Sequence, residues 1–342
     1  MKQVKTERLT QQDVDRAAEL LAQGALVGIP TETVYGLGAN GLDEAAVARI
    51  FEAKGRPQDN PLILHVPSAE WIIRYCQAVP QAAFELAYNF WPGPLTMVLE
   101  RRECVPDRVT AGLDTVGVRC PDHDLCRAVI AKAGVPVAAP SGNLSGRPSP
   151  TTAEHMLEDM DGKIEAVLDG GACQVGVEST IVDLTCYPPR LLRPGGVTLE
   201  QLELVLGRVE VDDAVRRRMD EGEQPRAPGM KYRHYAPVAP VTVVKGSPEA
   251  AAEYIAVHSV PGDGVVCFEE FLSKFPDRVV ENLGPTEDVA AQARRIFDAL
   301  RAFDHTEVGR IWAQCPEDTG LGLAVANRLN KAAGFHIVEV EG

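Results

Sequence analysis

The chain has 342 residues, of which 45% are hydrophobic and 6% aromatic, and its formal net charge is −15. This length is enough for two domains, each with a core of aliphatic residues and alanine. The chain has no run of about 18 apolar residues, and its N-terminus lacks the apolar segment of a secretion signal, so we expect a cytoplasmic protein without membrane contact. The negative charge repels phosphate backbones, which favours a small substrate over stable nucleic-acid binding.

The eight cysteines contain no Cys-x-x-Cys pair. Zinc frameworks use such closely spaced ligands, so we predict no metal site built from protein side chains. Small buried residues in a reducing compartment are the simplest interpretation of these cysteines.

Helices and strands alternate along the N-terminal part. Helices are predicted over 10–23, 68–78, 80–90, 122–133 and 198–207. Further helices are predicted to begin at Asp43 and at Thr151. Strands are predicted over 25–29, 62–66, 95–99, 116–119 and 135–139, with short strands within 165–195. A loop is expected between the first strand and Asp43. The alternation predicts an α/β fold with substantial parallel pairing.

The composition changes at residue 208. Up to residue 233 the chain has seven Lys or Arg and six Asp or Glu with almost no apolar run, which is typical of a linker. Strands are again predicted over 241–244, 265–268, 278–280, 310–313 and 336–340, and helices after Ser247 and over 287–302 and 322–333. We therefore expect an N-terminal domain over 1–207, a linker or lid over 208–238, and a smaller α/β domain over 239–342.

Polar loops follow the N-terminal strands. Hydroxyls and glycines crowd 31–38, at the strand end where open α/β sheets bind ligands. Lys54 and Arg56 bracket a glycine, so backbone and charge can approach a phosphate together, although a solvated helix end would explain either cation alone. The loop 138–150 carries three serines and an asparagine in a Gly/Pro frame, which suits an oxyanion or phosphate, with an exposed loop as the alternative.

Charged or polar residues also end apolar strands. Arg119 at the end of its strand needs a negatively charged partner. A carboxylate of a ligand and the carboxylate of an internal Asp or Glu are equally good candidates. Ser179 and Arg193 are polar residues on otherwise apolar strands. They either belong to a site or are exposed at the edge of a sheet. No Gly-x-Ser-x-Gly elbow or Walker A loop is present, so neither a serine nucleophile nor a P-loop is indicated.

Taken in order, these motifs resemble the YrdC family, in particular its long two-domain members, the threonylcarbamoyl-AMP synthases. The specific matches are Pro-Thr-Glu-Thr-Val-Tyr-Gly-Leu at 30–37, Lys-Gly-Arg-Pro at 54–57, Asn-Pro-Leu at 60–62, Trp-Pro-Gly-Pro-Leu-Thr at 91–96 and Pro-Gly-Met-Lys-Tyr-Arg-His-Tyr-Ala-Pro at 228–237. The resemblance covers essentially the whole chain. One departure is Ser-Gly-Asn at 141–143, where Ser-Ala-Asn is commoner.

The resemblance implies a YrdC-like twisted open mixed sheet with flanking helices, followed by a smaller Rossmann-like α/β domain. It implies a nucleotidyltransferase that joins L-threonine, bicarbonate or carbon dioxide, and ATP into threonylcarbamoyl-adenylate and pyrophosphate. Mg²⁺ would accompany ATP, since its usual ligands include substrate phosphates. A separate transferase complex would then modify the adenosine beside the tRNA anticodon.

The resemblance also assigns site residues. Threonine would be held by Thr33, His65, Arg119, Ala139 and Ser179. ATP would be held by Arg56, Asn60, Thr115, Ser141, Ser149, Arg193 and Tyr235, with Asn143 and Ser145 as further candidates. Lys54 and Arg56 would act near the phosphates. A site of this kind positions reactants and neutralises charge without a covalent nucleophile, and it protects an unstable carbamate from water.

Two other functions compete with this interpretation. A carbamoyl-phosphate-dependent adenylating enzyme would also carry an acylphosphatase-like segment and zinc-finger cysteine pairs, and neither is visible in the sequence. An RNA-binding module would suit a concave basic surface, but the net charge of −15 opposes it.

Overall fold

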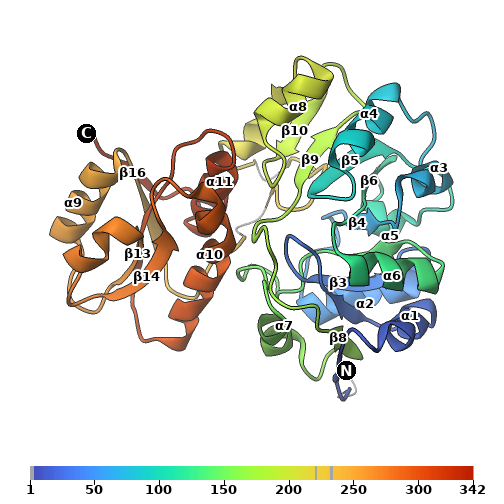
Figure 1. Ribbon diagram of the computed structural model, residues 1–342, viewed down its shortest axis with the longest axis horizontal. Helices are drawn as coiled ribbons and strands as arrows, with labels where there is room; N and C mark the ends of the chain where they lie inside the picture. Colours follow the sequence, from blue (N-terminus) through green and yellow to red (C-terminus); the bar gives the residue numbers. More distant parts are fainter. Residues whose placement is uncertain (1–3, 220–221, 232–233, 342) are drawn as a thin grey trace.

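The structure, a computed structural model, describes residues 4–219, 222–231 and 234–341 and forms two lobes (Figure 1). Among these residues, eleven strands form the first sheet, in the order β1 (Glu7–Leu9), β8 (Ala166–Leu168), β2 (Val27–Ile29), β3 (Gly36–Asn40), β7 (Val137–Ala138), β4 (Ile63–His65), β6 (Thr115–Arg119), β5 (Leu95–Glu100), β9 (Thr180–Asp183), β10 (Arg190–Arg193) and β11 (Glu210–Val211). The strands β4 and β6 pair in parallel, whereas β5 and β6 pair antiparallel. The predicted mixed sheet is therefore confirmed.

Helices cover this sheet. They are α1 (Val14–Ala22), α2 (Glu44–Lys54), α3 (Ile72–Tyr75), α4 (Gln81–Phe90), α5 (Asp107–Thr110), α6 (Asp124–Ala133), α7 (Ala153–Met160) and α8 (Leu199–Leu206). The Asp43 carboxylate accepts hydrogen bonds from the first amides of α2, and Gly55 ends that helix in the left-handed conformation, with φ of 61°. These two caps fix where Lys54 leaves the helix.

The segment 36–40, expected as part of a loop, is the strand β3. The expectation was wrong because glycine disfavours strands in general, whereas here close neighbours require it. A Cβ at Gly38 would lie 2.9 Å from Cγ1 of Val137 and 3.1 Å from the carbonyl oxygen of Val27. The glycines of this motif therefore allow a central strand to fit between β2 and β7.

The second lobe is built on five parallel strands among the described residues, in the order β14 (Val279–Gly284), β13 (Gly264–Phe268), β15 (Ile311–Gln314), β12 (Val241–Lys245) and β16 (Ile337–Glu339). Its helices are α9 (Pro248–His258), α10 (Val289–Ala302) and α11 (Gly322–Ala332). All five residues of β13 are buried, as expected for a parallel strand covered on both faces. The predicted smaller α/β fold of this part is confirmed.

The helices α10 and α11 lie on the side of the second sheet that faces the first lobe (Figure 1). Val34 and Val177 of the first lobe belong to the apolar core of the second lobe, as does Tyr235 of the connecting segment. The segment 208–238 also contributes β11 to the first sheet. The lobes therefore share packed side chains where they meet. None of the helices in the described ranges has the length and hydropathy that a membrane span requires.

Candidate active site

One cavity at this junction gathers most of the predicted site residues. It is lined by Thr33, Lys54, Arg56, His65, Arg119, Ala139, Ser141, Asn143, Ser145, Ser179, Arg193 and Tyr235, together with residues to which no binding role was assigned, among them Glu178 and His234. These residues are far apart in the sequence, and the order of strands in the first sheet brings them together. The cavity volume is about 50 Å³, which is room for a few water molecules.

Three predicted residues do not line the cavity. Thr115 lines a smaller adjoining pocket that shares Ile63 and Pro228 with it. Ser149 is fully buried, and its hydroxyl donates to the Glu178 carboxylate at 2.5 Å. Asn60 is buried, and neither its amide oxygen nor its amide nitrogen has a partner among the described residues.

His65 and Arg119 are paired neighbours on β4 and β6, and both are buried. The Arg119 guanidinium donates to Oε2 of Glu32 at 2.7 Å and to the carbonyl oxygen of Gly93 at 3.3 Å. Of the two partners expected for Arg119, the structure therefore contains the internal carboxylate. Burial, reinforced by the charge of Arg119, lowers the pKa of His65 to about 3, so its imidazole is neutral at ordinary pH.

The two cations at the end of α2 are held by backbone carbonyl groups. The Lys54 ammonium donates to the carbonyl oxygens of Ser141, at 2.5 Å, and of Asn143. The Arg56 guanidinium donates to the carbonyl oxygen of Pro61 at 3.1 Å. Burial and the neighbouring Arg56 lower the pKa of Lys54 well below its ordinary value. Both side chains line the cavity, where the charge of Arg56 suits an anion, and an anion bound beside Lys54 would in turn favour the charged form of that lysine.

The opposite wall is built from β9, β10 and the connecting segment. Arg193 donates twice to the carbonyl oxygen of Ser179, at 3.0 and 2.9 Å, and once to that of Pro228 at 3.3 Å. Tyr235 has a φ of 65°, a left-handed conformation that is uncommon for a bulky residue. Its ring packs on Phe297 of α10 with centroids 5.3 Å apart. The connecting segment is therefore anchored to both lobes.

A buried ion pair from the second lobe supports this wall. Arg328 of α11 is fully buried, and its guanidinium donates to Glu178 at 2.8 Å and to the carbonyl oxygen of Pro194 at 2.8 Å. Burial alone would raise the pKa of Glu178, but Arg328 and Arg193 more than offset it and hold the pKa below its ordinary value. Sequence reasoning did not select either partner. An arginine within the apolar helix pattern of 322–333 was the available signal.

The cavity suits the binding of anions more than covalent catalysis. Within the described part of the chain, its charged lining comprises Lys54, Arg56, Arg119 and Arg193 against one carboxylate, that of Glu178, which is already paired. Hydroxyls and carbonyl groups supply the remaining polar lining. Among the residues that the structure describes, no group of three His, Cys, Asp or Glu side chains could hold a metal ion. An α/β scaffold with such a cavity is typical of proteins that bind phosphorylated small molecules.

Comparison with known proteins identifies the family. Residues 19–195 match a family model described as "Telomere recombination", and residues 197–334 match one described as "Threonylcarbamoyl-AMP synthase, C-terminal domain". The chain is 47% identical to the threonylcarbamoyl-AMP synthase of Pyrococcus abyssi, covering 98% of each chain, and 46% identical to that of Bacillus subtilis, covering 97% of each. The crystal structure of P. abyssi Sua5 complexed with L-threonine matches with a TM-score of 0.89 at 46% identity, over 98% of this chain and 99% of that one.

The chain therefore belongs to the threonylcarbamoyl-AMP synthase family, in the form that carries both the YrdC-like and the C-terminal regions. The resemblance deduced from the sequence motifs is confirmed. The individual binding roles that it implied remain predictions.

Proposed function

We propose that the cavity binds L-threonine and ATP side by side and joins them, with bicarbonate or carbon dioxide, into threonylcarbamoyl-AMP and pyrophosphate. The observation that carries this proposal is the assembly of twelve predicted residues on one cavity of a chain that is 47% identical to a named threonylcarbamoyl-AMP synthase. The crystal structure of P. abyssi Sua5 complexed with L-threonine supports the binding of the amino acid.

Threonine would occupy the side of the cavity formed by Thr33, His65, Arg119, the backbone of Ala139, and Ser179. The Arg119 guanidinium would take the carboxylate of threonine while keeping Glu32, since its five donors allow two acceptors. A neutral His65 imidazole can donate to or accept from the threonine hydroxyl. The amine of threonine, once neutral, attacks carbon dioxide, and the resulting carbamate oxygen then attacks the α-phosphorus of ATP, which releases pyrophosphate.

ATP would lie against Lys54, Arg56, Ser141 and Arg193, whose charges and hydroxyl suit phosphate oxygens. The catalytic work would be positioning of the carbamate and charge stabilisation on the leaving pyrophosphate. No residue needs to form a covalent bond in this scheme.

Entry of ATP requires the connecting segment to move. The cavity of about 50 Å³ is far smaller than ligand pockets of about 300–1,000 Å³. Pro228, Gly229, His234 and Tyr235 of this segment line the cavity and would form its cover. Withdrawal of this cover would admit the nucleotide, and its return would exclude water from the carbamate.

Mg²⁺ would arrive with ATP. The carboxylate that lines the cavity, Glu178, already accepts hydrogen bonds on both oxygens, from Ser149 and from Arg328. The donor set therefore fits an ion that is held by phosphate oxygens and water, with hydroxyls such as Ser141 nearby. Such an ion would neutralise phosphate charge.

The product would pass to a transferase that modifies the adenosine beside the tRNA anticodon. We propose that this chain acts in the cytoplasm and makes the adenylate without a stable complex with tRNA, in keeping with its net charge of −15.

Pyrophosphate release tests the proposal. The assay contains threonine, bicarbonate and MgATP, and each is withheld in turn. Release should depend on all three, and the product should carry radiolabel from both threonine and bicarbonate. Release that is indifferent to threonine would reject the proposal, and serine in place of threonine serves as the specificity control.

A further inference from the structure

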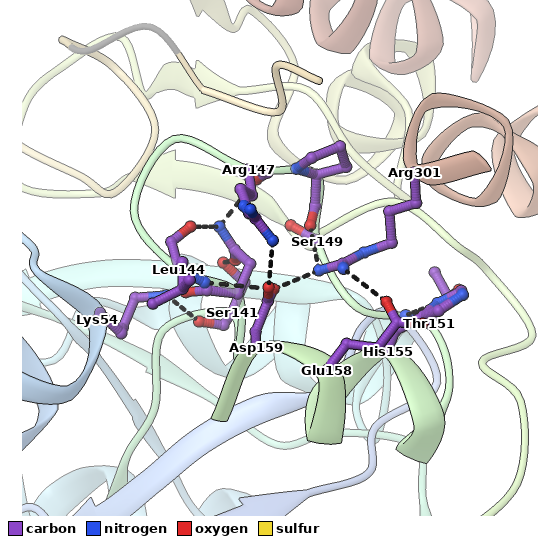
Figure 2. Close-up of polar contacts among 12 residues, drawn as sticks. Lys54, Ser141, Leu144, Arg147, Ser149, Thr151, His155, Glu158, Asp159 and Arg301 are labelled. Atoms are coloured by element: carbon purple, nitrogen blue, oxygen red, sulfur yellow. Dashed lines mark hydrogen bonds and ion pairs between the residues drawn. The ribbon is translucent and has the colours of Figure 1, made fainter. Parts of the chain in front are cut away.

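A buried polar network joins the second lobe to the loop 141–149 (Figure 2). Its centre is the carboxylate of Asp159 on α7, whose side chain has no exposed surface. Oδ2 of Asp159 accepts from Arg301 of α10 at 2.6 Å and from the backbone N–H of Leu144 at 3.3 Å. Arg301 also donates to the carbonyl oxygen of Pro148 at 2.7 Å. One guanidinium from the second lobe thus reaches the loop at two points, directly and through Asp159.

The same loop builds one side of the active-site cavity. Ser141, Asn143 and Ser145 line that cavity, and the carbonyl oxygens of the first two hold the Lys54 ammonium. The backbone N–H of Ser145 donates in turn to the carbonyl oxygen of Lys54 at 2.9 Å. Any shift of the loop therefore moves both the hydroxyls and the cation that face the proposed nucleotide.

Arg301 is the buried counter-charge of Asp159. The other guanidinium in contact, that of Arg147, lies 3.2 Å from Oδ1, and its side chain is 43% exposed, whereas the Arg301 side chain is 6% exposed. A buried carboxylate that loses its buried partner is strongly destabilised in its charged form. Without Arg301, the carboxylate would be left with the partly exposed Arg147 as its counter-charge, so its hydrogen bond to Leu144 would be held less firmly.

The charges of this network also act on Lys54. Burial is the main reason why the pKa of Lys54 is low, while Asp159 raises that pKa and Arg301 lowers it. The network thus lies close enough to the cavity to affect its electrostatics as well as its shape.

We propose that Arg301 is a positioning residue of the active site, and that through Asp159 and Pro148 it fixes the loop 141–149 in the arrangement that receives ATP. The C-terminal lobe thereby completes a site that lies on the N-terminal lobe. The kinetic consequence rests on the proposed function, whereas the ordering of the loop does not.

The experiment uses the full-length protein. Arg301→Met removes the charge, both hydrogen bonds and the ion pair to Glu158 at 3.5 Å, at similar side-chain length, and Arg301→Lys keeps the charge. The double variant Asp159→Leu/Arg301→Met replaces the buried pair by apolar side chains, which is often neutral for stability, and so provides a folded protein if the single variant fails to fold. Arg294→Met is the matched control, because Arg294 is an exposed arginine on the same helix.

Two readouts separate positioning from general stability. Amide hydrogen exchange compares the peptide 141–149 with β5, and steady-state kinetics of pyrophosphate release give KM for ATP and for threonine separately. In Arg301→Met and in the double variant, exchange in 141–149 should rise about tenfold with β5 unchanged. The KM for ATP should rise about tenfold or more, while that for threonine changes by less than about twofold. Arg301→Lys should recover part of both effects, and Arg294→Met should match the wild type.

Unchanged exchange in 141–149 and an unchanged KM for ATP in a folded variant would overturn the proposal. An equal rise of exchange in 141–149 and β5 would overturn it too, since that pattern reports global loosening. If the wild-type protein released no threonine-dependent pyrophosphate, the proposed function would fail, and the exchange measurement would still decide whether Arg301 orders the loop.

Discussion

His65 should make the stability of the first lobe depend on pH in a calculable way. Its folded-state pKa is lowered to about 3, mainly by burial, whereas an unfolded histidine has a pKa of about 6.5. Between pH 6.5 and 3 the unfolded state therefore binds up to one proton more than the folded state. Linkage then requires the free energy of unfolding to fall as the pH falls from 6.5 towards 3, and the full contribution is present above pH 6.5.

The magnitude follows from these two pKa values. One unit below the unfolded pKa, at pH 5.5, the loss is about 1.4 kcal/mol relative to pH 7.5. The variant His65→Gln cannot take up this proton. Its stability should therefore fall by about 1.4 kcal/mol less than that of the wild type over the same interval. The other histidines are common to both proteins, so their contributions cancel in the difference.

Urea unfolding at pH 7.5, 6.5 and 5.5 measures this difference. All proteins carry Trp312→Phe, which removes the tryptophan of the second lobe, so that the fluorescence of Trp71 and Trp91 follows the first lobe. The control variant His336→Gln replaces an exposed histidine of the second lobe. Parallel pH profiles for wild type and His65→Gln would refute the reasoning, because they would mean that His65 takes up its proton in the folded state.

Three further predictions concern packing, charge and the metal ion. Arg328→Met should destabilise the protein by about 3–5 kcal/mol in urea unfolding, since it leaves Glu178 buried without its main partner, and a loss below about 1 kcal/mol would contradict this. Gly38→Ala should cost about 1–3 kcal/mol, because the added methyl meets Val137 at 2.9 Å, while Gly222→Ala, which meets nothing within 4 Å, serves as control. EDTA should abolish pyrophosphate release and added Mg²⁺ should restore it, and release that persists in excess EDTA would exclude a required divalent ion.

The fold could be predicted from the sequence because hydrophobic residues in the longer helices and strands recur with the period of the element that they form. The helix predicted over 287–302 is α10, over Val289–Ala302, and the strand predicted over 265–268 lies within β13. The strand β3 was missed because its glycines carry no strand propensity, and the reason for them lies in Val27 and Val137 on neighbouring strands. Local composition therefore predicts a strand only where the side chains of that strand fill the space between it and its neighbours.

The candidate site was predictable where its residues form contiguous motifs. The cations at 54–56 and the serines of 141–149 stand out because no core needs them in that order. Sequence reasoning gave two equal partners for Arg119, a ligand and an internal carboxylate. Pairing with Glu32 depends on how the loop after β2 approaches β6, which no local pattern contains.

The buried arginines of the second lobe could also have been recognised from the sequence. Arg301 follows Phe297 by four residues on α10, so it lies on the apolar face of that helix rather than on its solvent face. Burying a guanidinium is costly unless a carboxylate meets it, so an arginine on an apolar face predicts a buried acidic partner. Asp159 and Glu178 are such partners, for Arg301 and Arg328, and both lie in the first lobe. A C-terminal region without a ligand motif of its own is thus tied by two charges to the walls of a cavity more than 100 residues away in the sequence.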